Sequence, residues 1–489
     1  MLNRPVGPRG VGHAVPGPAA RAGTDLNGES DTPHMEVFGS SGTRGVANET
    51  VTPAFALRVA RAVVTVLDAG RVALARDTRA TGEMLANAAA SGIASAGSDV
   101  DRLGVLPTPG LQAYADREGV PGLMITASHN PAQYNGIKLF EAGGRDLPVE
   151  TIEAVETAFL SESFASPAWD ETGTERRIES ARGAYREAVV AAVDRDRIAG
   201  ADLTVAIDPG HGAGALTSPD LFRDLGCSVR TVHACPDGRF PGRDPEPVES
   251  NLDDLKRLVR TSEADVGIAH DGDADRATFV DERGECVGGD ATLAALAAAE
   301  LEPGDVAVSA VNVSGRLVDA VASAGAELEL TRIGSTWIVD RVSTLREAGE
   351  RVPIAGEGNG GIVFPEYRLA RDGAYTAARF LELLADRPAS RVVAAYDDYH
   401  TVRANVTYDS SEDRDAMLDA VAAHAEHERD RAEVTTTDGY RLDYNDGWVL
   451  ARPSGTEPLA RVVAEATAPD RARELLESVR DPIERARTR

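Results

Sequence analysis

"PAFALRVARAVVTVLDAGRVALARDTRATGEMLANAAASGIASAG" occupies residues 53–97 and decides the fold class. Apolar residues recur at helical spacing in 53–70 and again in 82–97, whereas the short apolar run at 71–77 between them is typical of a buried strand. A further short run, "GLMITA" at 122–127, predicts another strand. Strand and helix patterns that alternate in this way predict an α/β fold built on a parallel sheet.

The chain is too long for one hydrophobic core, because 489 residues correspond to three or four domains of roughly 150 residues each. The segments "SPAWDETGT" (166–174) and "ADRPASR" (385–391) indicate linkers, and 411–431 predicts an acidic, solvated helix in the C-terminal region. Residues 1–34 lack apolar periodicity and are interpreted as a disordered tail or an over-long start before Met35. The predicted domains are 35–166, 167–285, 286–388 and 389–489.

The chain is strongly acidic. Asp and Glu number 79 against 51 Lys and Arg, which gives a formal net charge of −28 and disfavours nonspecific binding to nucleic acid or to anionic membranes. Among the basic residues only Lys138 and Lys256 are lysine, so arginine supplies the other 49. Acid excess with arginine bias predicts a salt-adapted protein, although GC-rich coding would produce the same arginine bias.

Features of export and membrane insertion are missing from the sequence. There is no apolar run of about 18 residues and no charged-then-apolar leader pattern, which predicts a cytoplasmic protein. The three cysteines, Cys227, Cys235 and Cys286, are too few and wrongly spaced for a disulfide framework or a zinc site. We expect buried, reduced thiols.

The strongest chemical signal is "ADVGIAHDGDADR" (264–276), in which Asp271, Asp273 and Asp275 follow an apolar strand at alternate positions. Three carboxylates at close range repel one another, and a hard divalent cation such as Mg²⁺ relieves that repulsion. Glu282 falls at position 12 of a calcium EF-hand loop, but Arg276 occupies position 6, where that loop requires glycine. A plain acidic turn is the other alternative.

"LARPSGTEPLARV" (450–462) combines Arg452 with the hydroxyls of Ser454 and Thr456 and the exposed backbone of Gly455. This composition favours a phosphate-binding loop. The alternative is a helix capping box formed by Ser454 and Glu457, but the residues that follow, 459–466, have the pattern of a strand.

Two glycine clusters carry weaker signals. In "PIAGEGNGGIVF" (353–364), Glu357 and Asn359 could bind sugar hydroxyls, although a simple hairpin turn explains the glycines equally well. In "VAIDPGHGAGA" (205–215), the spacing G-x-G-x-x-A allows a dinucleotide turn, but no acidic residue ends a clear second strand about 20 residues later. A structural turn or a phosphate nest is the favoured interpretation of the second cluster.

Ser128 lies in "GLMITASHNP" (122–131), where an apolar strand runs into polar residues. By itself this stretch allows a turn residue, a hydrolase nucleophile or a phosphate acceptor. A hydrolase would need a base, and adjacent His129 would point away from Ser128 in an extended segment; no G-x-S-x-G motif is present. Lys138, ten residues later, is either a titratable charge in the same site or a leftover surface lysine.

Five stretches of the sequence, taken in order, resemble the motifs of the α-D-phosphohexomutase family over residues 35–489. They are "FGSSGTRG", "TASHNP", "DGDADR", "GEGNGG" and "RPSGTEP". The resemblance implies three related α/β domains with mixed sheets plus a smaller C-terminal α+β domain around a central cleft. It also implies an enzyme that moves a phosphoryl group between the 6- and 1-positions of a hexose through a phosphoserine and a bisphosphate intermediate, as a monomer or homodimer.

The resemblance assigns roles to individual residues. Ser128 becomes the phosphoserine and, with Asp271, Asp273 and Asp275, a Mg²⁺ ligand. The remaining assignments are Arg276, His129, Lys138 and Arg44 around the transferring group, Glu357 and Asn359 at the sugar hydroxyls, and Arg452, Ser454, Gly455 and Thr456 at the distal phosphate.

The sequence departs from the family pattern at two places. Asn359, Gly360 and Gly361 stand where many members have Ser-Gly-His, and Arg332 stands where a lysine is expected. The "GNGG" form and "RPSGTEP" resemble archaeal phosphoglucosamine mutases, so glucosamine phosphate is favoured over glucose or mannose phosphate. A noncatalytic sugar-phosphate-binding protein is the less favoured alternative, because the catalytic and binding motifs are both intact.

Overall fold

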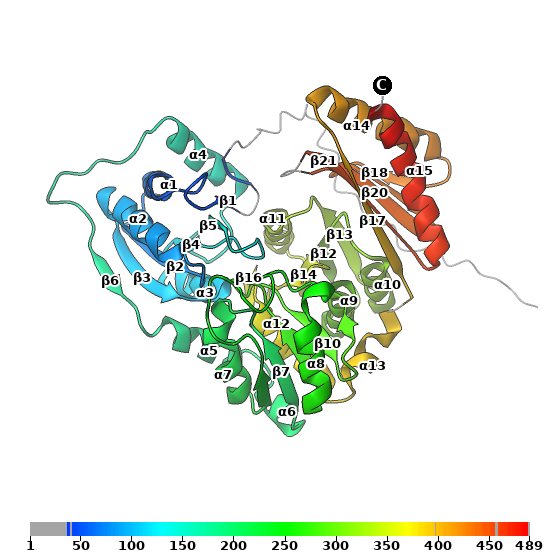
Figure 1. The fold of residues 1–489 in the computed structure, drawn as a ribbon, viewed down its shortest axis with the longest axis horizontal. Coiled ribbons are helices and arrows are strands. Elements are labelled where there is room, and N and C mark those ends of the chain that lie inside the picture. Colours follow the sequence, from blue (N-terminus) through cyan, green and yellow to red (C-terminus); the bar gives the residue numbers. More distant parts are fainter. Residues whose placement is uncertain (1–36, 40–41, 397, 455–457, 488–489) are drawn as a thin grey trace, which may run out of the picture.

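The computed structural model describes residues 37–39, 42–396, 398–454 and 458–487, which form four sheets with their helices (Figure 1). We refer to these as domains I to IV. Domain I lies at the left of Figure 1 and domain IV at the upper right, with domains II and III between them. The interpretation of residues 1–34 as a tail or over-long start lies outside the described residues, as do Gly455 and Thr456.

Domain I contains a mixed six-stranded sheet. Its order is β1 (Thr43–Val46), β5 (Tyr134–Phe140), β4 (Gly122–Ile125), β2 (Arg71–Arg76), β3 (Asp99–Val105) and β6 (Glu175–Arg177). Its helices are α1 (Pro53–Leu67), α2 (Gly82–Ser95), α3 (Thr108–Glu118) and α4 (Val149–Leu160). The helices predicted at 53–70 and 82–97 and the strands predicted at 71–77 and 122–127 are therefore confirmed.

Domains II and III repeat the central part of this topology. The second sheet is ordered β11 (Cys286–Val287), β10 (Thr278–Asp281), β9 (Val266–Ala269), β7 (Thr204–Asp208) and β8 (Ser228–Thr231). The third is ordered β13 (Glu327–Thr331), β12 (Val306–Ala310), β14 (Ile354–Glu357), β15 (Gly361–Phe364) and β16 (Arg368–Arg371). Each of the first three sheets has a run of three parallel strands followed by antiparallel ones, and in domain I β6 adds a fourth parallel strand beside β3.

The repeated topology places the sequence motifs at equivalent points. In each domain the last of the three parallel strands, β4, β9 or β14, is fully buried and leads into a polar loop before an antiparallel strand returns. Strands covered on both faces are continuously apolar, which explains why their ends are so abrupt in the sequence. The serine, aspartate and glycine-rich motifs occupy these three loops.

Helices cover the second and third sheets, and the two domains share one apolar core. The helices are α5 (Ala181–Ala191), α6 (Arg195–Gly200), α7 (Ser218–Asp224), α8 (Asp253–Ser262), α9 (Gly289–Glu300), α10 (Gly315–Ala324), α11 (Ser335–Glu347), α12 (Gly373–Leu384) and α13 (Ala389–Val393). A single cluster of buried side chains runs from Val205 and Ile268 in domain II to Ile354 in domain III. Within it, the rings of Phe279 on β10 and Phe380 on α12 lie 4.3 Å apart.

Domain IV is an antiparallel sheet with helices on one face. The order is β17 (His400–Thr407), β21 (Leu459–Ala466), β20 (Gly447–Pro453), β19 (Tyr440–Tyr444) and β18 (Glu433–Thr435). Figure 1 shows α14 (Ser411–Glu428) and α15 (Pro469–Arg487) on the outer side of this sheet. The predicted acidic helix at 411–431 and the strand at 459–466 are confirmed, so the capping-box interpretation of Ser454 is wrong.

None of the helices in the described part of the chain is both long enough and apolar enough to cross a membrane.

The three cysteines have free thiols, as expected. Cys227 is buried and Cys286 is half-buried, whereas Cys235 is exposed, so the prediction of burial is wrong for Cys235.

Candidate active site

Ser128 lies at the contact between domains I and II. It follows β4 with a left-handed backbone, φ +52°, which costs a residue with a side chain on the order of 1 kcal/mol. Its N–H donates to Oγ1 of Thr126 (2.9 Å), and its hydroxyl donates to Oδ2 of Asp271 (2.7 Å). The local turn therefore aims the serine hydroxyl out of domain I at the aspartate loop of domain II.

Arg79, which no sequence motif marked, stabilises the loop that carries Ser128. Its guanidinium is buried and donates to four carbonyl oxygens of the loop, those of Ser128 (2.9 Å), Asn130 (2.5 Å), Pro131 (2.7 Å) and Tyr134 (2.8 Å). Asp77 accepts from Nε of Arg79 (3.1 Å) and from the Thr126 hydroxyl (2.6 Å). Arg79 is thus a positioning residue for Ser128.

Replacing Arg79 with methionine should lower the free energy of unfolding by about 3–5 kcal/mol, because the Asp77 carboxylate would be left buried and unpaired. Denaturant unfolding measures the effect. Arg76→Met is the matched control, since its partner Glu83 is 61% exposed and its loss should cost less than about 1 kcal/mol. Equal losses in the two variants would contradict the positioning role.

The three aspartates of the second motif converge. Asp271, Asp273 and Asp275 are buried in the loop between β9 and β10, and each offers a carboxylate oxygen within 4.8 Å of the others. The Oδ1 atoms of Asp273 and Asp275 are buried and have no hydrogen-bond partner among the residues that the structure describes. Buried carboxylate oxygens left in this state fit a bound cation, so the cluster could hold a metal ion.

The EF-hand alternative is wrong. Strands flank the aspartate loop on both sides, and Glu282 accepts a hydrogen bond from the backbone N–H of Ser390 (3.1 Å) and one from its hydroxyl.

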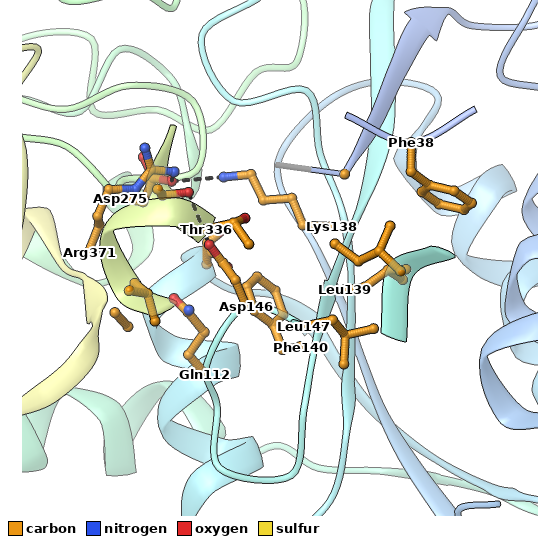
Figure 2. A pocket seen from close by; sticks show the side chains of 16 residues that line it. Phe38, Gln112, Lys138, Leu139, Phe140, Asp146, Leu147, Asp275, Thr336 and Arg371 are labelled. Carbon is orange, nitrogen blue, oxygen red and sulfur yellow. Dashed lines mark hydrogen bonds and ion pairs between the residues drawn. The ribbon is translucent and has the colours of Figure 1, made fainter. Parts of the chain in front are cut away.

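Two cations from other elements reach the aspartates. Lys138, on β5, is buried and donates through Nζ to Oδ2 of Asp273 (2.7 Å) and of Asp275 (2.8 Å). Arg371, on β16, donates to Oδ2 of Asp275 (2.6 Å) and was not identified from the sequence. In Figure 2 both side chains approach Asp275 beside a cavity between domains I and III. The surface-lysine interpretation of Lys138 is therefore wrong.

Burial and charge separate the pKa values in this cluster. Burial, followed by the negative charges of Asp275 and Asp273, raises the pKa of Asp271. Burial would also raise the pKa of Asp275, but Arg371 and Lys138 lower it on balance. Burial alone would lower the pKa of Lys138, but the negative charges of Asp273 and Asp275 raise it on balance. Lys138 is consequently a fixed positive charge.

His129, Arg276 and Arg44 gather beside Ser128. Burial, followed by the positive charges of Arg276 and Arg44, lowers the pKa of His129 to about 2, so the imidazole is neutral. Desolvation and the charge of Arg276 lower the pKa of Arg44, although its side chain remains accessible to solvent. The Ser128 hydroxyl donates to Asp271 rather than to the adjacent imidazole, so the serine–base pair of a hydrolase is not formed.

The glycine-rich loop of domain III forms a tight hairpin, as the simpler interpretation predicted, with Glu357 opposite Gly361. Glu357 is buried and accepts from Nδ2 of Asn359 (3.3 Å), whose own oxygen accepts from the N–H of Gly361 (2.9 Å). The carbonyl of Gly360 accepts from the N–H of Ala277 (3.1 Å), just after the aspartate loop. The hairpin is thereby fixed relative to the metal cluster, while its contact with a sugar stays a prediction.

Arg452 and Ser454 lie at the end of β20. Arg452 donates to Oδ2 of Asp438 (2.7 Å), which also accepts from the N–H of Ile333 in domain III (3.1 Å). The phosphate-binding roles of Gly455 and Thr456 fall outside the described residues. Arg332 stacks over the ring of Trp337, with 5.1 Å between the guanidinium carbon and the ring centroid.

The dinucleotide alternative at 205–215 is wrong, because protein atoms fill the glycine turn. A Cβ at Gly210 would lie 2.6 Å from the Arg243 guanidinium, and one at Gly212 would lie 2.5 Å from the carbonyl oxygen of Gly272. These glycines permit close packing under the aspartate loop, where Arg243 donates to the carbonyl of His270 (2.6 Å). The turn is structural.

Comparison with protein-family models finds all four domains of one family. Residues 35–166, 183–284 and 288–399 match the alpha/beta/alpha domains I, II and III described as phosphoglucomutase/phosphomannomutase, and residues 404–481 match its C-terminal domain.

Individual relatives agree with these matches. The chain is 42% identical over 452 residues to a phosphoglucomutase/phosphomannomutase of Thermococcus kodakarensis, covering 90% of this chain and 97% of that protein. It is 39% identical over 454 residues to a probable phosphoglucosamine mutase of Methanopyrus kandleri, covering 92% and 98%. A crystal structure of a phosphoglucomutase/phosphomannomutase family protein from Burkholderia thailandensis matches with a TM-score of 0.79 at 27% identity, covering 91% and 97%. The chain therefore belongs to the phosphoglucomutase/phosphomannomutase family of α-D-phosphohexomutases.

Proposed function

We propose that the protein interconverts hexose 6-phosphate and hexose 1-phosphate with Ser128 as the phosphoryl carrier. The observation that carries the proposal is the contact between the Ser128 hydroxyl and Asp271 (2.7 Å), which places a nucleophile from one domain against the aspartate cluster of another. A serine that served only a turn would not need this carboxylate partner.

Asp271, Asp273 and Asp275 would hold Mg²⁺, for which an all-oxygen ligand set is suitable. When bound, the ion supplies neutralisation of the charge that spreads over the phosphoryl oxygens. Arg276 would steady the same oxygens from the end of the loop. Lys138, held charged by Asp273 and Asp275, keeps the cluster from repelling an incoming phosphate as strongly as three free carboxylates would.

The reaction begins with a phosphoryl group on Ser128. The free hydroxyl oxygen of the sugar phosphate attacks phosphorus, the bond from phosphorus to Oγ of Ser128 breaks, and a sugar bisphosphate forms. The proton of the attacking hydroxyl ends on Oγ of Ser128 as its bond to phosphorus breaks, and we assign the relay of this proton to the imidazole of His129. After the bisphosphate turns around, its other phosphoryl group passes back to Ser128 and leaves the isomerised monophosphate.

Separate elements would hold the remainder of the substrate. Glu357 and Asn359 would bind sugar hydroxyls, Arg44 would face the transferring group, and the distal phosphate would bind Arg452, Ser454, Gly455 and Thr456. Phosphoryl transfer depends mainly on positioning and charge neutralisation, which matches a site rich in fixed cations and poor in reactive groups.

We infer that glucosamine 6-phosphate is the preferred substrate. The "GNGG" form of the hairpin supports this choice, as does the name of the Methanopyrus relative, whereas the name of the Thermococcus relative supports glucose or mannose phosphate.

The expected result is the highest kcat/KM with glucosamine 6-phosphate among glucosamine, glucose and mannose 6-phosphates, measured with purified protein and Mg²⁺. A strong preference for mannose 6-phosphate would reject the glucosamine assignment but not the mutase. A lack of conversion of all three would reject the mutase itself.

A further inference from the structure

Thr108, the first residue of α3, contacts Asp273 across the boundary between domains I and II. Its backbone N–H donates to the carbonyl oxygen of Asp273 (2.9 Å), and its buried hydroxyl donates to Oδ2 of the same residue. Thr108 lies in "LPTPG" (106–110), where a proline on each side restricts the backbone. A conformationally restricted turn of domain I therefore holds a single aspartate of domain II.

The two carboxylate oxygens of Asp273 have different surroundings. Oδ2 accepts from the Thr108 hydroxyl and from Nζ of Lys138 (2.7 Å), and both donors belong to domain I. Oδ1 is buried and has no hydrogen-bond partner among the residues that the structure describes. Two donors on one oxygen restrict the rotation of the carboxylate and leave the other oxygen available to a cation.

The two donors to Oδ2 are not equivalent. Nζ of Lys138 is shared between Asp273 and Asp275, whereas the Thr108 hydroxyl donates to Asp273 alone. The N–H of Thr108 is one of the first N–H groups of α3, which have no partner within their own helix, and its bond to Asp273 does not depend on the side chain. Replacing threonine with valine, which has nearly the same shape, therefore changes only the contact with the carboxylate.

We propose that Thr108 is a positioning residue for metal binding, because its hydroxyl fixes the Asp273 carboxylate so that Oδ1 stays available to the cation. This inference rests on the proposed function, in which Asp271, Asp273 and Asp275 hold Mg²⁺. Hydrogen-bond partners that orient a metal ligand contribute to metal affinity without touching the metal. The metal site would thus depend on domain I as well as on the aspartate loop of domain II.

Calorimetric titration of the metal-free protein with Mg²⁺, in the absence of sugar phosphate, tests the inference. Thr108→Val should bind Mg²⁺ about 10- to 100-fold more weakly than the wild type, whereas Thr108→Ser, which keeps the hydroxyl, should bind it nearly as well. Thr65→Val on α1 is the matched control. The Thr65 hydroxyl donates to the carbonyl of Arg61 (2.7 Å) and accepts from the N–H of Ala165 (2.8 Å), so this variant also loses hydrogen bonds of domain I but should keep the wild-type affinity.

Activity as a function of Mg²⁺ concentration provides a second readout. The activity of Thr108→Val should recover with excess Mg²⁺, which a merely structural defect would not do. Thr108→Ala removes the same hydroxyl and provides the same comparison if the valine variant does not fold. Wild-type affinity in a folded variant without the hydroxyl, or an equal loss in Thr108→Ser, would overturn the inference. If the wild type binds Mg²⁺ but converts none of the hexose phosphates, the mutase is rejected and the titration alone decides the role of Thr108.

Discussion

Replacing Ser128 with alanine should reduce the interconversion of hexose 6- and 1-phosphates by about 10⁴-fold or more, because the phosphoryl carrier is lost while its surroundings remain. Coupled assays of product formation measure the rate. Mass spectrometry of wild-type protein after incubation with hexose 1,6-bisphosphate should locate one phosphate on Ser128.

The alanine variant should still bind hexose phosphate within a few-fold of the wild type, since the residues assigned to the sugar and the distal phosphate are unchanged. This binding, with an unaltered unfolding transition, is the control for a local effect. Wild-type turnover by the variant, or phosphate found reproducibly elsewhere and never on Ser128, would refute the carrier role.

Asp273→Asn should have the second largest effect, a fall in kcat of about 10²- to 10³-fold. Charge neutralisation by a metal ion is worth several kcal/mol in phosphoryl transfer, and the amide replaces one of three carboxylates with a neutral group of nearly the same shape. Activity as a function of Mg²⁺ concentration should shift to higher concentrations, and direct titration should show weaker metal binding.

The matched control is Asp220→Asn in the same domain, where the carboxylate is 59% exposed and pairs with Arg223 on the surface. It should leave both measurements unchanged. Identical metal dependence of Asp273→Asn and the wild type would show that the cluster does not serve as the metal site.

The sequence predicted the parts of the site that local patterns encode. Ser128 and Asp271 follow buried apolar strands, and the change from apolar to polar residues is visible without tertiary information. The hairpin that carries Glu357 was visible as a strand, a glycine-rich turn and another strand. These motifs occupy equivalent loops of three sheets, although the chain shows no repeat of fixed period, because topology requires buried strands and not particular residues.

The residues that the sequence did not reveal act over long separations. Arg371 reaches Asp275 from a strand of another domain, and Arg79 holds a loop about fifty positions away. Among 49 arginines neither has a distinguishing neighbourhood. Their importance depends on which carbonyls and carboxylates the fold brings to them. Lys138 was easier to single out because lysine is so rare in this chain.

The apolar core shared by domains II and III determines how the molecule divides mechanically. Separation of either sheet would expose apolar side chains of the other to water, so the two domains behave as one cooperative unit. The four sheets therefore correspond to three cooperative units, of which domains II and III form one. Asp271 and Glu357 belong to the same unit. The distance between them is therefore independent of any change in the position of domain I or domain IV.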